Sequence, residues 1–206
     1  MILDRSLTEP LVAWVLNKSV RDFFVNIVPE HHTEGKPLGF RYMHKPSAGV
    51  LHSGYPYQEV STIADSMLEY YDLHLDTPIE PNYGYLISYS EEGHEVHPHR
   101  DANWYGDGPD VNQREYKPKN WIGDVVHCRL NVLISKPVSG GNPIIKGIEL
   151  PVAENEAWIC MSGAHTHSTT RVQGSKPRIL LSLGYFIPTK LAVERGWIDK
   201  VSKNNS

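Results

Sequence analysis

The hydrophobic period of the chain changes at Thr77-Pro78, and this change restricts the possible folds more than any other feature. Before it, apolar residues recur at i, i+3, i+4 and i+7, which predicts an amphipathic helix over residues 59–74. After it, Tyr83, Tyr85, Ile87 and Tyr89 alternate with other residues, as along one face of a β-strand. The sequence therefore predicts helices first and strands afterwards.

The first segment of the chain also carries a helix signal. Thr8-Glu9-Pro10 resembles a helix start, with a hydroxyl cap and a proline in the first turn. The apolar pattern stops at Val28-Pro29, so we predict one or two amphipathic helices that end there. Residues 30–57 are rich in Gly, Pro and His and should be mostly loop, with one short strand over residues 39–43.

Short apolar runs joined by Gly and Asn turns make up the second half of the chain. The predicted strands cover residues 125–133, 144–150, 157–161 and 179–186, with a turn at Ser139-Gly140-Gly141-Asn142. Helices followed by short strands favour a mainly β fold of the jelly-roll or barrel kind, with the N-terminal helices on one side.

The length of the chain bounds its domain organisation. At 206 residues it lies near the upper end of the usual single-domain size, so we expect one domain. Residues 1–78 would form a helical and loop scaffold, residues 79–188 the β core, and residues 189–206 a C-terminal tail.

The composition excludes some classes of partner. Twenty Lys and Arg against 24 Asp and Glu give a net charge of -4, which offers no electrostatic case for nucleic acid or an anionic membrane. Cys128 and Cys160 each lie in an apolar run, so buried free thiols in a reducing compartment are favoured over a disulfide. The chain shows neither a secretion signal nor a long apolar segment. We expect a soluble cytoplasmic protein, acting as a monomer or small homo-oligomer.

His99 and Asp101 carry the main functional signal. Two residues apart in an extended strand, their side chains leave on the same face and can bind one metal ion. His165 or His167 could add a third ligand, completing the two-histidine, one-carboxylate set of non-haem Fe(II) oxygenases. Strand alternation cannot separate His165 from His167. His97 shares parity with His99, but no carboxylate stands two residues after it.

A set of residues in this half matches one family in order. They are Tyr89, His99-Arg100-Asp101, Cys128-Arg129-Leu130-Asn131-Val132, His167-Ser168 and Pro177-Arg178-Ile179. This order resembles the 2-oxoglutarate- and Fe(II)-dependent oxygenases, in particular the aspartyl/asparaginyl, prolyl and phytanoyl-type hydroxylases. The resemblance covers residues 83–186, about half the chain.

The resemblance implies a double-stranded β-helix that uses Fe(II), 2-oxoglutarate and O2. Its metal ligands would be His99, Asp101 and His167, the last chosen because Arg178 follows it by eleven residues, from 167 to 178. Arg178 would pair with the distal carboxylate of 2-oxoglutarate, since a guanidinium presents a planar fork that matches a carboxylate.

Four further side chains are predicted to line the cosubstrate pocket: Arg129, Asn131, Tyr89 and Ser182. Arg129 and Asn131 alternate onto one face of their strand, as Arg178 and Ser182 do on theirs. Tyr89 lies ten residues before His99, where the hydroxylases commonly have a pocket tyrosine. Arg129 could equally be a structural ion-pair partner.

The implied reaction couples oxidative decarboxylation of 2-oxoglutarate to succinate with hydroxylation of an unactivated C–H bond. Asp101 stands where family halogenases have a small residue, so hydroxylation is expected. The substrate would be a small metabolite or amino-acid-like compound, with a peptide side chain as the alternative. Residues 102–123 are predicted to form a lid. Its aromatic residues Trp104, Tyr105 and Trp121 would contact the substrate.

Two other kinds of metalloenzyme, neither of which uses 2-oxoglutarate, stay open. A non-catalytic binding module is a third alternative, although such a module would tolerate the loss of any ligand and all three ligands are present. A cupin-type site usually has a Glu four or five residues after its second His, where Asn103 and Trp104 stand here. A zinc hydrolase would use His and Asp ligands but would have no need of Arg178 near the metal.

Overall fold

The computed structural model describes residues 1–21, 25–26, 40–44, 54–73, 85–101 and 125–199. The helices are α1 (Arg5–Leu16), α2 (Lys18–Arg21), α3 (Tyr57–Tyr70) and α4 (Thr189–Glu194). The strands are β1 (Val25–Asn26), β2 (Phe40–His44), β3 (Tyr85–Ser90), β4 (Val125–Ser135), β5 (Pro143–Ile145), β6 (Ile148–Glu149), β7 (Ala157–Cys160), β8 (His167–Thr169) and β9 (Arg178–Pro188). The predictions for Tyr83 and for residues 102–123 lie outside the described residues.

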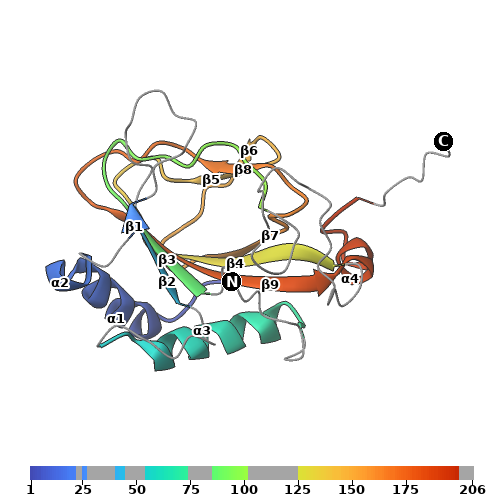
Figure 1. The fold of residues 1–206 in the computed structure, drawn as a ribbon, viewed down its shortest axis with the longest axis horizontal. Helices are drawn as coiled ribbons and strands as arrows, with labels where there is room; N and C mark the ends of the chain where they lie inside the picture. Colours follow the sequence, from blue (N-terminus) through green and yellow to red (C-terminus); the bar gives the residue numbers. More distant parts are fainter. Residues whose placement is uncertain (22–24, 27–39, 45–53, 74–84, 102–124, 200–206) are drawn as a thin grey trace.

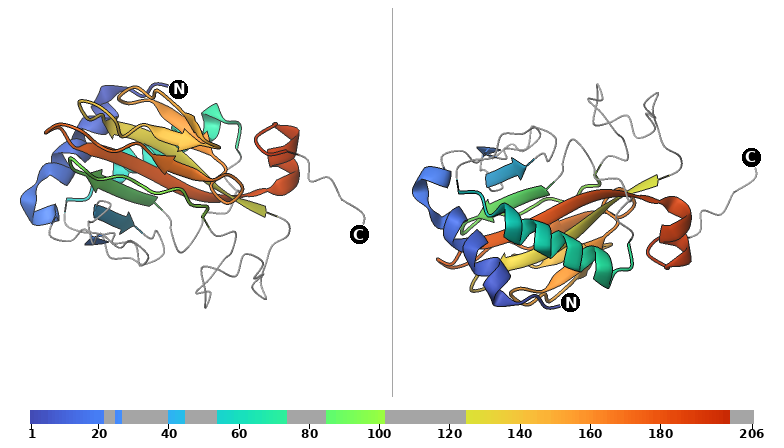
Figure 2. Two further views of the ribbon diagram at one scale, coloured as in Figure 1. Left: turned by 90° about the horizontal axis from the view of Figure 1, so that it is seen from above. Right: turned by 90° about the horizontal axis from the view of Figure 1, so that it is seen from below.

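The strands form two antiparallel sheets. The larger sheet has the order β1-β2-β3-β9-β4-β7, and the smaller has the order β6-β5-β8. Figure 1 shows α1 and α3 beneath the larger sheet and the smaller sheet above it. Seen from below, α1 and α3 lie across the larger sheet (Figure 2). The predicted mainly β fold with N-terminal helices on one side is confirmed.

The central strands β3, β9 and β4 are buried on both faces of the larger sheet. The face toward α1 and α3 belongs to the main hydrophobic core, and alternate residues along each strand supply it. It holds Tyr85, Ile87 and Tyr89 of β3, Cys128, Leu130 and Val132 of β4, and Ile179, Leu181 and Leu183 of β9. The residues between them point to the opposite face, toward the smaller sheet.

α1 begins earlier than the sequence predicted. Asp4 is its N-cap, and the Asp4 Oδ1 accepts a hydrogen bond of 2.8 Å from the backbone N–H of Ser6. Thr8 and Pro10 lie inside the helix, and the Thr8 hydroxyl donates to Asn155 Oδ1 at 2.7 Å. The prediction of a start at Thr8 is wrong because Asp is at least as good an N-cap as Thr and stands one turn earlier.

The predicted helix over residues 59–74 is α3, which ends at Tyr70 rather than at residue 74. Its buried side chains are Val60, Ile63, Ala64, Met67 and Leu68, which follow the predicted stripe. The chain leaves the helix through Asp72, whose φ is 51°, and Leu73 N–H donates to Leu68 O at 2.8 Å. This bond closes the last turn and so ends the helix.

The predicted strands over residues 39–43, 125–133, 157–161 and 179–186 correspond to β2, β4, β7 and β9. The segment predicted as one strand over residues 144–150 is instead the hairpin of β5 and β6. Lys146 and Gly147 between them have φ of 55° and 80°. Both angles are positive, as the central residues of a two-residue hairpin turn require. The region expected to be a tail begins with α4.

Cys128 and Cys160 are free and buried, as expected, and burial raises the pKa of Cys128 well above its usual value and that of Cys160 to about 12. Within the described part of the chain, no helix has the length and apolar character needed to cross a membrane.

The packing of α3 on the larger sheet predicts an unequal response to two alanine substitutions. Ile63 has no exposed surface, so Ile63→Ala should lower the free energy of unfolding by about 2–5 kcal/mol through lost burial and a cavity. Glu69→Ala, at an exposed position of the same helix, should change it by less than about 0.5 kcal/mol. Urea denaturation measures both, and equal effects would contradict this packing.

Candidate metal centre

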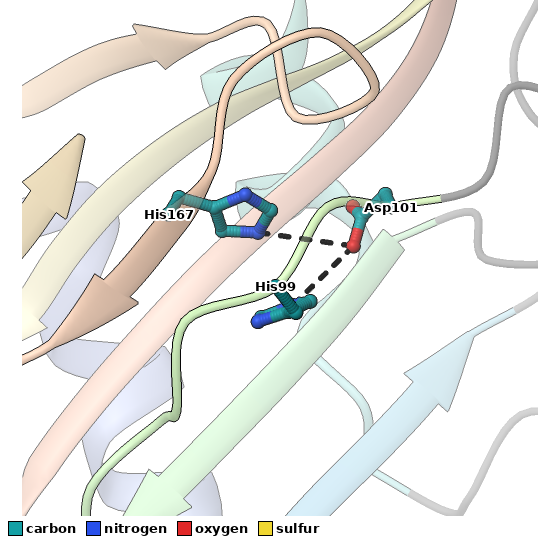
Figure 3. Close-up of side chains that lie close together, drawn as sticks. All are labelled: His99, Asp101 and His167. Atoms are coloured by element: carbon teal, nitrogen blue, oxygen red, sulfur yellow. Dashed lines mark ion pairs between the residues drawn. The ribbon is translucent and has the colours of Figure 1, made fainter. Parts of the chain in front are cut away.

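Three potential metal ligands converge from two segments of the chain. His99 and Asp101 come from the segment after β3, and His167 is the first residue of β8 (Figure 3). Nε2 of His99 lies 3.5 Å from Asp101 Oδ1, and Nε2 of His167 lies 3.8 Å from the same oxygen. One ligand atom from each residue lies within 4.8 Å of the other two, so the three residues could hold one metal ion.

Backbone hydrogen bonds hold the two segments together. His99 N–H donates to His167 O at 3.0 Å, and His167 N–H donates back to His99 O at 2.9 Å. Asp101 N–H donates to Ser162 O at 2.9 Å. The segment pairs with β8 through an isolated bridge at His99 and His167, and it is not the regular strand that the sequence predicted. His99 and Asp101 still emerge on one side, as expected.

Both histidines are oriented by a backbone carbonyl two residues earlier. Nδ1 of His99 lies 2.8 Å from His97 O, and Nδ1 of His167 lies 3.1 Å from His165 O. A neutral imidazole that donates from Nδ1 presents the lone pair of Nε2. Such bonds commonly orient metal-binding histidines, so the two rings are arranged to bind an ion through Nε2.

His165, the alternative third ligand, is directed elsewhere. Its Nε2 lies 2.7 Å from the carbonyl oxygen of Trp197, on the segment after α4. His97 is also outside the convergent group, with its Nε2 3.7 Å from Glu95 Oε1. Of the two candidates, the structure brings His167 to Asp101, and its role as the third ligand stays a prediction.

The second oxygen of Asp101 faces two further side chains from β4. Arg129 Nε donates to Oδ2 at 3.3 Å, and His127 Nδ1 lies 3.4 Å from Oδ2. Burial alone would raise the pKa of Asp101, but His99, His127, Arg129 and His167 outweigh it and hold that pKa well below its usual value. Burial lowers the pKa of His167, with Asp101 opposing the shift. An ionised Asp101 and a neutral His167 are the forms that bind metals.

His127 was not among the residues predicted for the site, and the structure places it there. Its side chain is only 1% exposed, and its ring centroid lies 5.6 Å from that of Phe186. The sequence did contain a usable signal, because His127 shares parity with Arg129 and Asn131. Strand alternation, from which Arg129 and Asn131 were predicted to face the pocket, predicts the same direction for His127.

Arg178, the predicted partner of the cosubstrate, is buried on the face of the larger sheet opposite the helices. Its Nε donates to Gly141 O at 2.7 Å, and burial lowers its pKa to about 10, so it remains a cation at neutral pH. A Cβ at Gly141 would lie 2.9 Å from Arg178 Cδ, so glycine allows this close approach. Among the described residues, no carboxylate forms an ion pair with Arg178.

Two more predicted residues share this face. Asn131 pairs across the sheet with Ser182, and Asn131 Nδ2 donates to Arg129 O at 3.3 Å. Ser182 is 4% exposed and stands on the same side of β9 as Arg178. His127, Arg129, Asn131, Arg178 and Ser182 therefore make one buried polar face, hereafter the polar face.

Tyr89 is not brought to the polar face. It pairs with Ile179, whereas Arg178 pairs with Ser90, so strand alternation places Tyr89 on the helix side, within the main core. Its hydroxyl donates to Glu91 Oε1 at 3.0 Å. The sequence argument used only its separation from His99 and ignored cross-strand register, and this position does not support a pocket role. The predicted substrate contacts Trp104, Tyr105 and Trp121 lie outside the described residues.

No family model and no curated protein matches this chain, but solved structures share its fold. A Pseudomonas putida prolyl-4-hydroxylase aligns with a TM-score of 0.56 at 14% identity, over 90% of this chain and 88% of its own. The viral collagen prolyl hydroxylase vCPH of Paramecium bursaria Chlorella virus-1, in a 2OG complex, aligns with a TM-score of 0.53 at 13% identity, over 90% and 91%. AviO1 of Streptomyces viridochromogenes Tue57 aligns with a TM-score of 0.51 at 15% identity, over 91% and 87%. The predicted resemblance is thus confirmed at the level of the fold.

The geometry predicts different metal affinities for two neighbouring histidine variants. His167→Ala removes a proposed metal ligand. Loss of a residue that only hydrogen-bonds to a ligand typically lowers metal affinity by about 10- to 100-fold, so the Mn(II) affinity of His167→Ala should fall by more than this. His165→Ala should leave the affinity near the wild-type value, because only the backbone carbonyl of His165 contacts His167. Electron paramagnetic resonance of free Mn(II) measures both affinities. A greater loss in His165→Ala would exchange the two assignments.

Proposed function

We propose that this chain is a non-haem Fe(II) dioxygenase that uses 2-oxoglutarate and O2. The observation that carries the proposal is the convergence of His99, Asp101 and His167 at one point, together with the buried cation Arg178 on the polar face. Two imidazole nitrogens and one carboxylate oxygen fit Fe(II), and they leave three of its six positions open.

Arg178 supports 2-oxoglutarate as the cosubstrate. A buried guanidinium is costly without a counter-ion, and the described residues provide it with a carbonyl oxygen but no carboxylate. The distal carboxylate of 2-oxoglutarate would supply the missing charge in a bidentate pair. Ser182 and Asn131 stand on the same face and could add hydrogen bonds to this anion.

Iron and 2-oxoglutarate, when bound, supply the oxidative decarboxylation to succinate and the hydroxylation of a C–H bond. The chain itself contributes binding and orientation. His99, Asp101 and His167 hold the metal, while Arg178 fixes the far end of the cosubstrate and so sets its direction toward the open positions. Because Asp101 is a carboxylate and occupies a metal position, we propose hydroxylation, and a chlorinated product would contradict it.

The two sheets would form the double-stranded β-helix of this oxygenase superfamily within a single domain, in a cytoplasmic monomer or small homo-oligomer. The substrate would be a small metabolite or an amino-acid-like molecule. Two of the structural neighbours are described as prolyl hydroxylases, which keeps a peptide side chain as the alternative substrate.

Product formation tests the proposed chemistry. In air, wild-type protein with Fe(II), 2-oxoglutarate and ascorbate, which supplies the two electrons that a substrate C–H bond would otherwise give, should produce succinate and carbon dioxide. Omission of Fe(II) or of 2-oxoglutarate should stop production. Asp101→Ala should abolish it, because a metal ligand is lost. Asp199→Ala, at a side chain that is 93% exposed, should leave it unchanged. Absence of succinate from the wild type, or equal activity of a Zn(II) form, would favour a metalloenzyme that does not use 2-oxoglutarate.

The two buried arginines should respond differently to loss of charge. Arg178→Met should raise KM for 2-oxoglutarate about 30-fold or more, because removing one partner of a buried charge pair costs about 2–5 kcal/mol. Its Mn(II) affinity should stay close to wild type. Arg129→Met should raise this KM less, because Arg129 Nε contacts Asp101. Steady-state kinetics with varied 2-oxoglutarate measures both, and the reverse order would exchange the two roles.

A further inference from the structure

The two carboxylate oxygens of Asp101 face different partners. Oδ1 lies toward Nε2 of His99 and Nε2 of His167, at 3.5 and 3.8 Å. Oδ2 accepts the hydrogen bond from Arg129 Nε at 3.3 Å, and it also lies 3.4 Å from His127 Nδ1. Figure 3 shows both imidazoles directed at the carboxylate of Asp101. One oxygen is therefore on the side of the metal ligands, and the other is on the side of β4.

Arg129 is buried between two neighbouring strands. It is 6% exposed and lies in the middle of β4, where it pairs with Gly184 of β9 and Cys160 of β7. A buried cation is costly unless it is paired, and Asp101 is the carboxylate that the described structure places against it. Rotation of the Asp101 carboxylate away from Arg129 would leave this charge without that partner.

We propose that Arg129 is a positioning residue that makes Asp101 bind the metal through Oδ1 alone. The inference rests on the metal site of the proposed function. A carboxylate can bind an ion through one oxygen or through both, and binding through both would require Oδ2 to leave Arg129. With Oδ2 retained by Arg129, Asp101 occupies one position, and the ion keeps three positions for other ligands instead of two.

Arg100 provides a matched control in the adjacent sequence position. Like Arg129 it is an arginine near Asp101, but its Nε contacts Thr166 Oγ1 at 3.4 Å and its side chain is exposed. Among the described residues, Arg100 forms no ion pair with Asp101. Loss of its charge should therefore leave the binding mode of Asp101 unchanged.

The number of water molecules on bound Mn(II) tests the inference. Proton relaxation of bulk water should indicate about three exchangeable waters on the ion in the wild type and about two in Arg129→Met, a decrease of about a third in the relaxation enhancement. Arg100→Met should give the wild-type value. Full hydration in Arg129→Met, or an equal decrease in Arg100→Met, would overturn the inference.

A second measurement uses the wild-type protein and does not depend on folding of Arg129→Met. The infrared difference spectrum recorded on adding Mn(II) contains the two stretching bands of the Asp101 carboxylate. These bands are assigned to Asp101 by their loss in Asp101→Asn, and their separation is the quantity measured. A wide separation, as for a carboxylate bound through one oxygen, is expected. A narrow separation, as for a carboxylate bound through both oxygens, would overturn the inference.

Failure of this inference can be distinguished from failure of the proposed function. Bound Mn(II) with about three waters in the wild type and about two in Arg129→Met supports the positioning role even if Fe(II) and 2-oxoglutarate give no succinate. Succinate formation with equal hydration in the two proteins supports the function and rejects the role of Arg129. A wild type that binds no Mn(II) rejects the positioning role together with the metal site.

Discussion

The structure depends on the burial of β3, β9 and β4 on both of their faces. Toward α1 and α3, alternate residues such as Leu130 and Leu181 join the main hydrophobic core, which supplies most of the apolar burial. The opposite face is therefore free to hold side chains that would weaken an apolar core. The polar face occupies it, and its charges stand in fixed positions because the strands that carry them are packed from the other side.

The two arginines of the polar face differ in the group that balances their positive charge, and this difference separates their roles in the site. Arg129 is paired with Asp101, whereas Arg178 bonds the carbonyl of Gly141 and has no carboxylate partner among the described residues. An unbalanced buried cation is destabilising in the absence of an anion. The first arginine therefore belongs with the candidate metal ligands, and the second is suited to an anionic ligand supplied from solution.

Local patterns in the sequence were sufficient for several parts of the fold and the site. The stripe from Val60 to Leu68 predicted α3, and the separation of His99 from Asp101 placed both on one side of their segment. The sequence was less informative where two nearby residues could each mark the same helix end. Asp4 and Thr8 are both acceptable caps, and the helix begins at the earlier one. The end of α3 depends on the left-handed conformation of Asp72, which no spacing rule indicates.

The sequence by itself determined the order of helices and strands, the residue types of the candidate metal centre and the presence of a buried arginine after His167. These features follow from periodicity and separation along a single segment. Tertiary structure alone decided that Tyr89 faces the helices, that His127 joins the site, and that Arg129 contacts Asp101. The physical reason is that a strand buried on both faces gives no polarity contrast to mark its inner side, so cross-strand register decides which side chains meet.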